Sequence, residues 1–251
     1  GQYGLNVIVE VVGVPDAWKH LLEYNGVANY MQAGIEAADK VTTVSPTYAG
    51  QILDPWYACR PDGILQARQF KIQGILNGID YDEYNPKTDK LIVKNYYSGA
   101  FVKGKAACKN DLREYFNLEK DDSPIISIVS RLVDHKGVDI IRDSAERLVN
   151  RGYQLVCLGS GEWQYEEFFR YLAGKYPGRV GVEIGFVPAL ARKIYAGSDM
   201  FLMPSKSEPC GLSQMIALRY GTVPIVRETG GLKDSVKDSL DGEGNGFTFR
   251  G

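Results

Sequence analysis

The stretch that decides the fold is MPSKSEPCGLSQMIALRYGTVPIVRETGGL, which occupies residues 203–232. It begins at the end of an apolar run, residues 200–203, which predicts a buried strand that Pro204 terminates. A polar turn that carries Glu208 follows, and a helical pattern begins near Gly211. The stretch therefore opens with a strand, a turn and a helix, in that order.

The second half of this stretch repeats the arrangement. Gly221 ends the first helix, and residues 223–226 predict a second strand. The tripeptide Thr229-Gly230-Gly231 then opens a further helix. Two helix N-termini thus lie beside one acidic turn, at the carboxyl ends of two strands. Open α/β sheets bind ligands at that edge, and backbone N–H groups of helix N-termini can receive phosphate there.

The same alternation extends outward from this stretch in both directions. Short apolar runs predict strands, and amphipathic segments between them predict helices. The predicted strands are 125–129, 155–158, 180–184, 200–203, 223–226 and 247–249, and the predicted helices are 103–116, 139–150, 162–175, 189–196, 212–220 and 232–237. Apolar strands that alternate with amphipathic helices indicate an α/β fold: a Rossmann-like parallel sheet with helices on both faces.

The first third of the chain is more mixed. Residues 7–12 form an apolar run that fits either a strand or a helix. Further along, the pattern predicts a helix at 28–39, a short strand at 41–44, and a strand that runs into a turn at 75–80. Tyr84-Asn85-Pro86 is typical of a linker. We therefore expect one domain over residues 1–84 and a second over residues 85–251.

Composition narrows the class of protein. The 251 residues carry a net charge of −2, with 44% apolar and 24% charged residues, as in ordinary soluble globular proteins. No dense basic stripe points to nucleic acid, and no apolar run approaches the roughly 20 residues of a membrane span. No signal peptide is visible, and Gly1 suggests a cut inside a longer chain rather than a native start.

The cysteines and histidines argue against a metal centre. The four cysteines lie far apart without a C-x-x-C pair, so neither a zinc site nor a disulfide framework is suggested. Two histidines are too few for a histidine metal site. Reduced thiols in a cytoplasm-like compartment are the simplest account.

The loop SRLVDHKG at 130–137 is the first candidate site. Arg131 offers a planar fork of donors and Lys136 a point charge, and together they can neutralise a pyrophosphate at the carboxyl edge of the sheet. A solvated turn is the alternative.

The next loop contains a G-x-G motif, Gly159-Ser160-Gly161, but Gln164 stands where a dinucleotide fingerprint needs glycine or alanine. A tight strand-to-helix turn is the better interpretation of that loop.

Three other positions have two interpretations each. Phe186 ends a strand and can stack on a nucleobase or pack in the core. Glu208 can contact a ligand or cap the N-terminus of a helix. Thr229-Gly230-Gly231 offers N–H groups to an anion, or is an ordinary helix entry. Cys210 has no paired histidine in the sequence around it, which argues against a nucleophilic role.

Six co-linear blocks carry a family resemblance. They are VTTVSPTYA at 41–49, GILNGIDYDEYNP at 74–86, SRLVDHKG at 130–137, EPCGLSQM at 208–215, LRYGTVPIVR at 218–227 and ETGGL at 228–232. Together they resemble bacterial glycogen synthases and plant starch synthases, the glycosyltransferases of family 5. The resemblance implies the B-type architecture of two Rossmann-like domains, with this chain supplying most of the second domain and a remnant of the first.

The resemblance also implies an activity. Glucose would pass from ADP-glucose to the non-reducing end of an α-1,4-glucan with retention of configuration, without a metal or other cofactor. The partners would be the sugar nucleotide and the glucan, and the protein would be cytoplasmic or in the plastid stroma. Nucleic acid and membranes would not be partners.

Individual residues match positions of the family motifs. Arg131 and Lys136 match the phosphate-binding cations, and Glu208 matches the acid beside the donor glucose. The expected nucleotide-sugar contacts are Asn77, Phe186, Gly211, Leu212, Ser213, Thr229, Gly230 and Gly231. Phe186 falls where a tyrosine often stacks near adenine, so the resemblance favours its stacking role.

The chain also departs from the family pattern. Ile216 replaces a second glutamate found in many retaining enzymes of this architecture, His135 replaces a common glutamine, Ser207 a phenylalanine and Gln32 a lysine. The amino-terminal lysine-glycine-glycine loop, a cleft histidine and the closing helices are missing, so we expect a fragment that is inactive alone. The alternatives are a UDP-sugar-dependent retaining enzyme, a non-catalytic glucan- or nucleotide-binding module, and a dinucleotide oxidoreductase.

Overall fold

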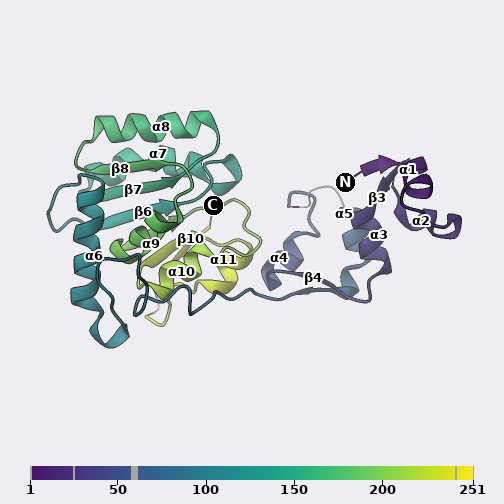
Figure 1. Cartoon of the computed structure of the whole chain (residues 1–251), viewed down its shortest axis with the longest axis horizontal. Helices are drawn as coiled ribbons and strands as arrows, with labels where there is room; N and C mark the ends of the chain where they lie inside the picture. Colours follow the sequence, from purple (N-terminus) through teal and green to yellow (C-terminus); the bar gives the residue numbers. More distant parts are fainter. Residues whose placement is uncertain (1, 25, 58–61, 241, 251) are drawn as a thin grey trace. The chain divides into compact units, whose positions relative to one another are not determined.

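The computed structural model describes residues 2–24, 26–57, 62–240 and 242–250, and Figure 1 shows their arrangement. The chain forms two compact units, Gly1–Leu76 and Asn77–Gly251. The sequence placed this boundary eight residues later, after Tyr84. The reason for the difference is Arg192, which donates to the backbone oxygen of Glu83 at 2.6 Å and ties the intervening segment to the second unit.

The second unit is a six-stranded sheet in which every strand pair is parallel. Its strands are β6 (Ile125–Val129), β7 (Gln154–Gly159), β8 (Val180–Ile184), β9 (Met200–Met203), β10 (Val223–Arg227) and β11 (Phe247–Phe249). Its helices are α6 (Phe101–Tyr115), α7 (Val138–Asn150), α8 (Trp163–Lys175), α9 (Pro188–Gly197), α10 (Ser213–Arg219) and α11 (Gly230–Ser235). The strand order is β11-β10-β9-β6-β7-β8.

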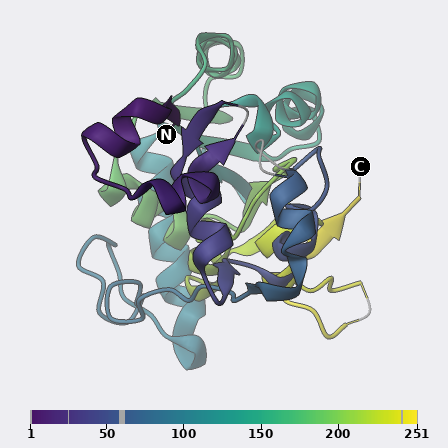
Figure 2. The same cartoon turned by 90° about the vertical axis from the view of Figure 1, so that its right-hand side faces the viewer.

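Both faces of the sheet are covered, as the alternating pattern predicts. Side chains of adjacent strand residues point to opposite faces, so Ile125 packs toward α6 and α9 while Ile126 packs toward α7 and α8. Helices α7 and α8 lie side by side on their face (Figures 1 and 2). The predicted α/β class is therefore confirmed, and every predicted strand and helix of this unit is present within three residues of its expected ends.

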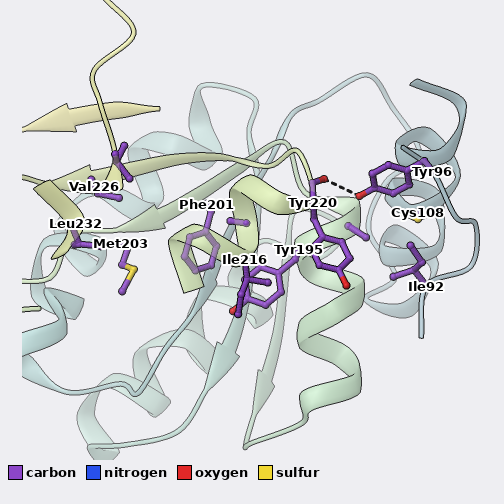
Figure 3. Packing of buried hydrophobic residues seen from close by; sticks show 13 residues of the cluster. Ile92, Tyr96, Cys108, Tyr195, Phe201, Met203, Ile216, Tyr220, Val226 and Leu232 are labelled. Atoms are coloured by element: carbon purple, nitrogen blue, oxygen red, sulfur yellow. Dashed lines mark hydrogen bonds between the residues drawn. The ribbon is translucent and has the colours of Figure 1, made fainter. Parts of the chain in front are cut away.

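The largest core cluster of this unit joins the sheet to α6, α9, α10 and α11. Figure 3 shows Tyr195, Phe201 and Ile216 packed together at its centre. At one end of the cluster, the hydroxyl of Tyr96 donates to the backbone oxygen of Tyr220 at 2.8 Å (Figure 3). This bond fixes the segment before α6 against the end of α10.

The first unit contains shorter elements. They are β1 (Gln2–Gly4), α1 (Leu5–Glu10), α2 (Lys19–Leu22), β2 (Glu23–Tyr24), β3 (Val27–Asn29), α3 (Tyr30–Ala37), β4 (Val41–Thr43), α4 (Pro46–Gln51), α5 (Asp62–Ala67) and β5 (Ile72–Gly74), with single 3-10 turns at Asp16–Trp18 and Gln69–Lys71. The ambiguous run at 7–12 lies largely in helix α1. No helix in the described part of the chain is long and apolar enough to cross a membrane.

Two predictions in the first unit were wrong in detail. The helix expected from residue 28 begins at Tyr30, because the Asn29 side chain caps it by accepting from the Met31 amide at 3.1 Å. The strand expected at 75–80 is β5, which ends at Gly74. A Cβ on Gly74 would lie 2.2 Å from the backbone oxygen of Ser45, so glycine permits the close approach there.

Candidate functional site

Strands β6 and β9 are neighbours in the sheet although two other strands lie between them in sequence. The chain runs outward in one direction from β6 through β7 to β8, and in the other from β9 through β10 to β11. The loops that follow β6 and β9 therefore meet at a topological switch point. Ligands of open α/β sheets bind in the crevice at such a point.

The two loops at the switch point are held together by backbone contacts. Gly137 has φ +71°, and a Cβ there would lie 2.1 Å from the backbone oxygen of Pro204. The Lys206 amide donates to the backbone oxygen of His135 at 3.0 Å. The Lys206 ammonium adds ion pairs to Asp134 at 3.0 Å and Asp139 at 2.8 Å. These contacts bring the predicted cationic loop and the predicted acidic turn onto one edge of the sheet.

Lys136 and Glu208 form a nearly buried ion pair. Lys136 Nζ lies 2.5 Å from Glu208 Oε2, and the two side chains are 15% and 8% exposed. The Ser205 hydroxyl donates to the same carboxylate oxygen at 3.3 Å. The capping interpretation of Glu208 is wrong, since the residue that precedes α10 is Leu212 and no side chain caps that helix. Glu208 instead positions Lys136.

The start of α11 packs against the turn that carries Glu208. The Gly231 amide donates to the backbone oxygen of Glu208 at 3.1 Å, and a Cβ on Gly231 would lie 2.1 Å from the backbone oxygen of Cys210. The Thr229 hydroxyl donates to the backbone oxygen of Lys206 at 3.5 Å. Thr229, Gly230 and Gly231 thus lie beside the turn, as predicted. However, the Gly231 amide that was expected to face an anion already has a protein partner.

Arg131 belongs to the same loop after β6 as Lys136. Its Nη2 is 3.4 Å from Nε2 of His135. Partial desolvation of the ring lowers the pKa of His135, and the charges of Lys136 and Arg131 lower it further. The two predicted cations therefore both act on this imidazole, which lies between them in the sequence.

A pocket of about 390 Å³ opens beside Arg131 at the carboxyl edge of the sheet. Four predicted site residues line it, namely Arg131, Phe186, Leu212 and Ser213. The other wall residues are Glu83, Tyr84, Val129, Ser130, Leu158, Gly159, Ser160, Gly185, Val187, Pro188, Ala191, Arg192, Tyr195 and Ile216. The remaining predicted residues are outside its wall, namely Asn77, Lys136, Glu208, Gly211, Thr229, Gly230 and Gly231. The site therefore has two parts, a pocket and an adjoining ion pair.

Phe186 lies at this pocket with 90% of its surface exposed. The alternative that it packs in the core is therefore wrong. It follows β8 directly after Gly185, and no other aromatic ring is in contact with it among the described ring pairs. An exposed ring at a pocket mouth can stack on a planar ligand group.

The glycines after β7 make a tight turn, as predicted. A Cβ on Gly159 would lie 1.9 Å from the backbone oxygen of Ser130, and one on Gly161 would lie 2.3 Å from that of Leu132. The Leu132 amide donates to the backbone oxygen of Ser160 at 2.9 Å. These glycines permit two loops to pack together, so they need no dinucleotide to explain them.

Sequence reasoning missed Arg192, which lines the pocket together with Glu83 and Tyr84. This buried arginine donates to the Glu83 carboxylate at 2.6 Å and to Asp89 at 3.3 Å, and its guanidinium lies 4.0 Å from the centre of the Tyr84 ring. The partners lie more than one hundred residues apart in the sequence. The only signal was a cation on the inward face of a predicted helix, next to Tyr195.

Tyr195 and Ser213 both line the pocket. Burial raises the pKa of Tyr195 to about 12, while a hydrogen bond with the Ser213 side chain opposes that shift. The tyrosine therefore stays protonated at neutral pH. Sequence reasoning selected Ser213 but did not select Tyr195, which belongs both to the core cluster and to the pocket wall.

Asn77 and Cys210 lie together near the acidic turn. Burial raises the pKa of the Cys210 thiol, and hydrogen bonds with the backbone and side chain of Asn77 act in the opposite direction. A protonated, buried thiol is a poor nucleophile. Among the described residues, no group of three or more His, Cys, Asp or Glu side chains is arranged to hold a metal ion.

A doubly wound sheet with two cations and two helix starts at its switch point is typical of ligand-binding α/β domains. Comparison with known families narrows this class. The family described as "Glycosyl transferases group 1" matches residues 110–249, and "Starch synthase catalytic domain" matches residues 1–67. The chain therefore belongs to the group 1 glycosyl transferases.

Curated relatives carry a consistent name. The glycogen synthase of Clostridium kluyveri is 50% identical over 254 residues, which are 99% of this chain and 53% of that protein. The glycogen synthase of Alkaliphilus metalliredigens is 50% identical over 231 residues, which are 91% of this chain and 48% of that protein. The chain spans about half the length of the curated relatives it matches.

Solved structures agree with the family assignment. The catalytic domain of starch synthase IV from Arabidopsis thaliana, bound to ADP and acarbose, matches with a TM-score of 0.90 and 34% identity. The match covers 100% of this chain and 54% of that chain. Anabaena HepE in complex with UDP-glucose has a TM-score of 0.61 at 17% identity, over 87% of this chain and 51% of that chain, and it shares the fold alone. The predicted glycosyltransferase architecture is confirmed.

Proposed function

We propose that this chain is the donor-binding part of a retaining glucosyltransferase that extends an α-1,4-glucan with glucose from ADP-glucose. The observation that carries the proposal is the Lys136–Glu208 pair next to the pocket at the switch point. The match to a starch synthase that binds ADP and acarbose supports this choice of donor and acceptor.

In this proposal, Arg131 and Lys136 bind the diphosphate. When ADP leaves, negative charge grows on a phosphate oxygen and the sugar becomes positively charged in character. Fixed cations aimed at that oxygen stabilise the transition state, and one such donor is typically worth about 3–4 kcal/mol. The Gly231 amide keeps its bond to Glu208, so the side chains supply most of this stabilisation.

Glu208 orients the donor sugar in this proposal and does not attack it. Its Oε2 already accepts from Lys136 and from the Ser205 hydroxyl, which lowers its nucleophilicity. Retention would then proceed by attack of the acceptor hydroxyl on the same face of the sugar, with the leaving phosphate accepting the proton. Isolation of a covalent glucosyl adduct on Glu208 would refute this mechanism.

Phe186 is the proposed stacking partner of the base. Its exposed ring lies at the pocket, and Glu83 and Arg192 are charged residues of the pocket wall. The same chemistry accommodates a uracil base, so the nucleotide preference needs a direct test. Isothermal titration with ADP and with UDP should show weak binding that favours ADP. Absence of heat at about millimolar ADP would contradict the proposal, and a preference for UDP would change the donor.

Turnover requires the other wall of the active-site cleft, because catalysis by proximity needs both reactants held in place. We therefore expect no synthase activity from this chain alone. Fusion to the complementary half of the Clostridium kluyveri glycogen synthase should give an active hybrid. In that hybrid, Lys136→Ala should slow turnover by about 10² or more. Near-normal turnover of the variant would remove Lys136 from the mechanism.

A further inference from the structure

His135 lies within the cationic loop of the site but has no role in the mechanism above. It belongs to a single turn, Asp134–Lys136, that leads into α7. Its backbone oxygen accepts from the Lys206 amide at 3.0 Å, which fixes the turn against the segment that carries Glu208. Its side chain is exposed, and it lies 3.4 Å from the Arg131 guanidinium.

The contact with Arg131 bears on the protonation state of the imidazole. A guanidinium can only donate, so this contact is a hydrogen bond when Nε2 of His135 carries no proton. An imidazolium would donate from both nitrogens and could not accept from Arg131. The contact with Arg131 therefore favours the neutral ring.

The charges around the ring favour the same state. Arg131 and Lys136 are the cations that face it, and Asp134 and Glu208 are the acids. Both acids already form ion pairs with lysines, since Asp134 lies 3.0 Å from the Lys206 ammonium and Glu208 lies 2.5 Å from the Lys136 ammonium. The N-terminus of α7, directly after this turn, adds partial positive charge. Partial desolvation of the ring and the two cations accordingly hold the pKa of His135 below its ordinary value.

We propose that His135 is a third member of the anion site and takes up one proton from solvent when a diphosphate binds. The inference rests on the proposed function, because it needs an anionic ligand at Arg131 and Lys136. Arg131 would turn from Nε2 to a phosphate oxygen, and the freed Nε2 would take the proton and donate to the ligand. No bond other than this N–H forms or breaks.

The sign of the pH effect follows from this linkage. An anion beside the ring raises its pKa, and proton uptake and ligand affinity then change together by thermodynamic reciprocity. The additional affinity is fully present below the pKa of the free protein's His135. It is lost as the pH rises through the higher pKa of the complex, by at most about tenfold per pH unit.

A glutamine at this position would behave differently. Its amide can accept from Arg131 or donate to phosphate without any change of charge. Glutamine is also the residue that the resemblance leads us to expect at position 135. His135→Gln is therefore a conservative variant that keeps the hydrogen bonds and removes the titration.

The test is calorimetric titration of the chain with ADP in two buffers of different ionisation enthalpy at about pH 7. The difference in heat gives the number of protons taken up. The wild type should take up a larger fraction of a proton than His135→Gln, whose value reports the ADP phosphate alone. The other histidine, His20, is exposed in the first unit, and His20→Gln should match the wild type.

A second measurement follows ADP affinity from about pH 6 to about pH 8. The wild-type affinity should fall more steeply with pH than that of His135→Gln, with both variants equally folded by circular dichroism. Equal slopes and equal proton counts would overturn the role of His135 and leave the proposed function intact. Absence of ADP binding by the wild type would instead overturn the proposed function.

Discussion

Lys136 Nζ lies 2.5 Å from Glu208 Oε2 although the two residues are 72 positions apart in sequence. Each comes from a loop that follows one of the two central strands, β6 and β9. The pair therefore joins the two halves of the doubly wound sheet at the switch point. A ligand phosphate would approach a cation whose position a carboxylate has already fixed.

Breaking this pair should destabilise the fold. Lys136→Met leaves the Glu208 carboxylate nearly buried without its cation, and removal of one partner of a buried pair costs about 3–5 kcal/mol. We expect a loss near the lower limit, because the Ser205 hydroxyl remains as a donor. Urea unfolding, monitored by circular dichroism, measures the change.

Lys120→Met is the matched control for that variant. Lys120 lies 2.6 Å from Glu114, but both side chains are more than 60% exposed. Exposed pairs contribute about 0–1 kcal/mol, so this variant should unfold almost as the wild type does. Similar losses for the two variants would show that the burial of the Lys136–Glu208 pair has no energetic effect.

Gly137→Ala should be among the more damaging single-methyl additions in the chain. Its backbone has φ +71°, where an L-residue costs about 1–2 kcal/mol, and its new methyl would lie 2.1 Å from the Pro204 oxygen. Gly152→Ala has φ +91° with no atom within 4 Å of the new methyl, so only the backbone cost applies. Thermal unfolding should give a clearly lower midpoint for Gly137→Ala, and equal midpoints would exclude the contact with Pro204.

Lys105 predicts a pH dependence of stability. Its ammonium bonds the Thr222 hydroxyl at 2.8 Å and the backbone oxygens of Ala196 and Tyr220 at 3.2 Å, and burial lowers its pKa to about 8. Between about pH 8 and 10.5 the unfolded state binds more protons than the folded state, so stability rises with pH in that window. The gain is at most about 1.4 kcal/mol per pH unit.

Comparison with Lys105→Met isolates that effect from the titration of tyrosines. The stability of the wild type relative to the variant should increase between about pH 8 and about pH 9.5, measured by urea unfolding at each pH. Parallel stability profiles would mean that Lys105 keeps its ordinary pKa in the folded protein.

Phe186→Ala should separate binding from stability. The side chain is 90% exposed, so its removal should change the free energy of unfolding by less than about 0.5 kcal/mol. Loss of a base-stacking ring should weaken ADP binding by about 1–3 kcal/mol. Tyr171→Ala removes an exposed ring from α8, outside the pocket wall, and should leave affinity unchanged. Unchanged ADP affinity of Phe186→Ala would contradict the stacking role.

The sheet could be predicted from the sequence because its signal is local. Apolar strands such as 125–129 and 200–203 alternate with amphipathic helices, and Gly221 ends α10 as expected. The positions of the loop cations and of Glu208 could also be predicted from the sequence, because the carboxyl ends of parallel strands meet at one edge of the sheet. Short elements of the first unit were less predictable, since tertiary contacts such as that of Gly74 with Ser45 decide where they end.

The pairing of site residues could not be predicted. Arg192 with Glu83, Lys136 with Glu208 and the Gly231 amide with the Glu208 oxygen are all long-range contacts in sequence. Their geometry depends on the packing of several loops at once. Residue type and spacing indicate which groups reach an edge of the sheet, but not which of them neutralise one another there.

The hydrogen bonds of Arg192 to Glu83 and Asp89 determine where the chain can be divided to make a chimaera. A second unit that began at Asn85 would lack Glu83, so the buried guanidinium of Arg192 would lose one of its acceptors. A second unit that began at Asn77 would keep both Glu83 and Asp89. Chimaeras that exchange lobes between glycosyltransferases are thus best joined between Leu76 and Asn77. The segment that the sequence suggested as a linker therefore belongs structurally to the second unit.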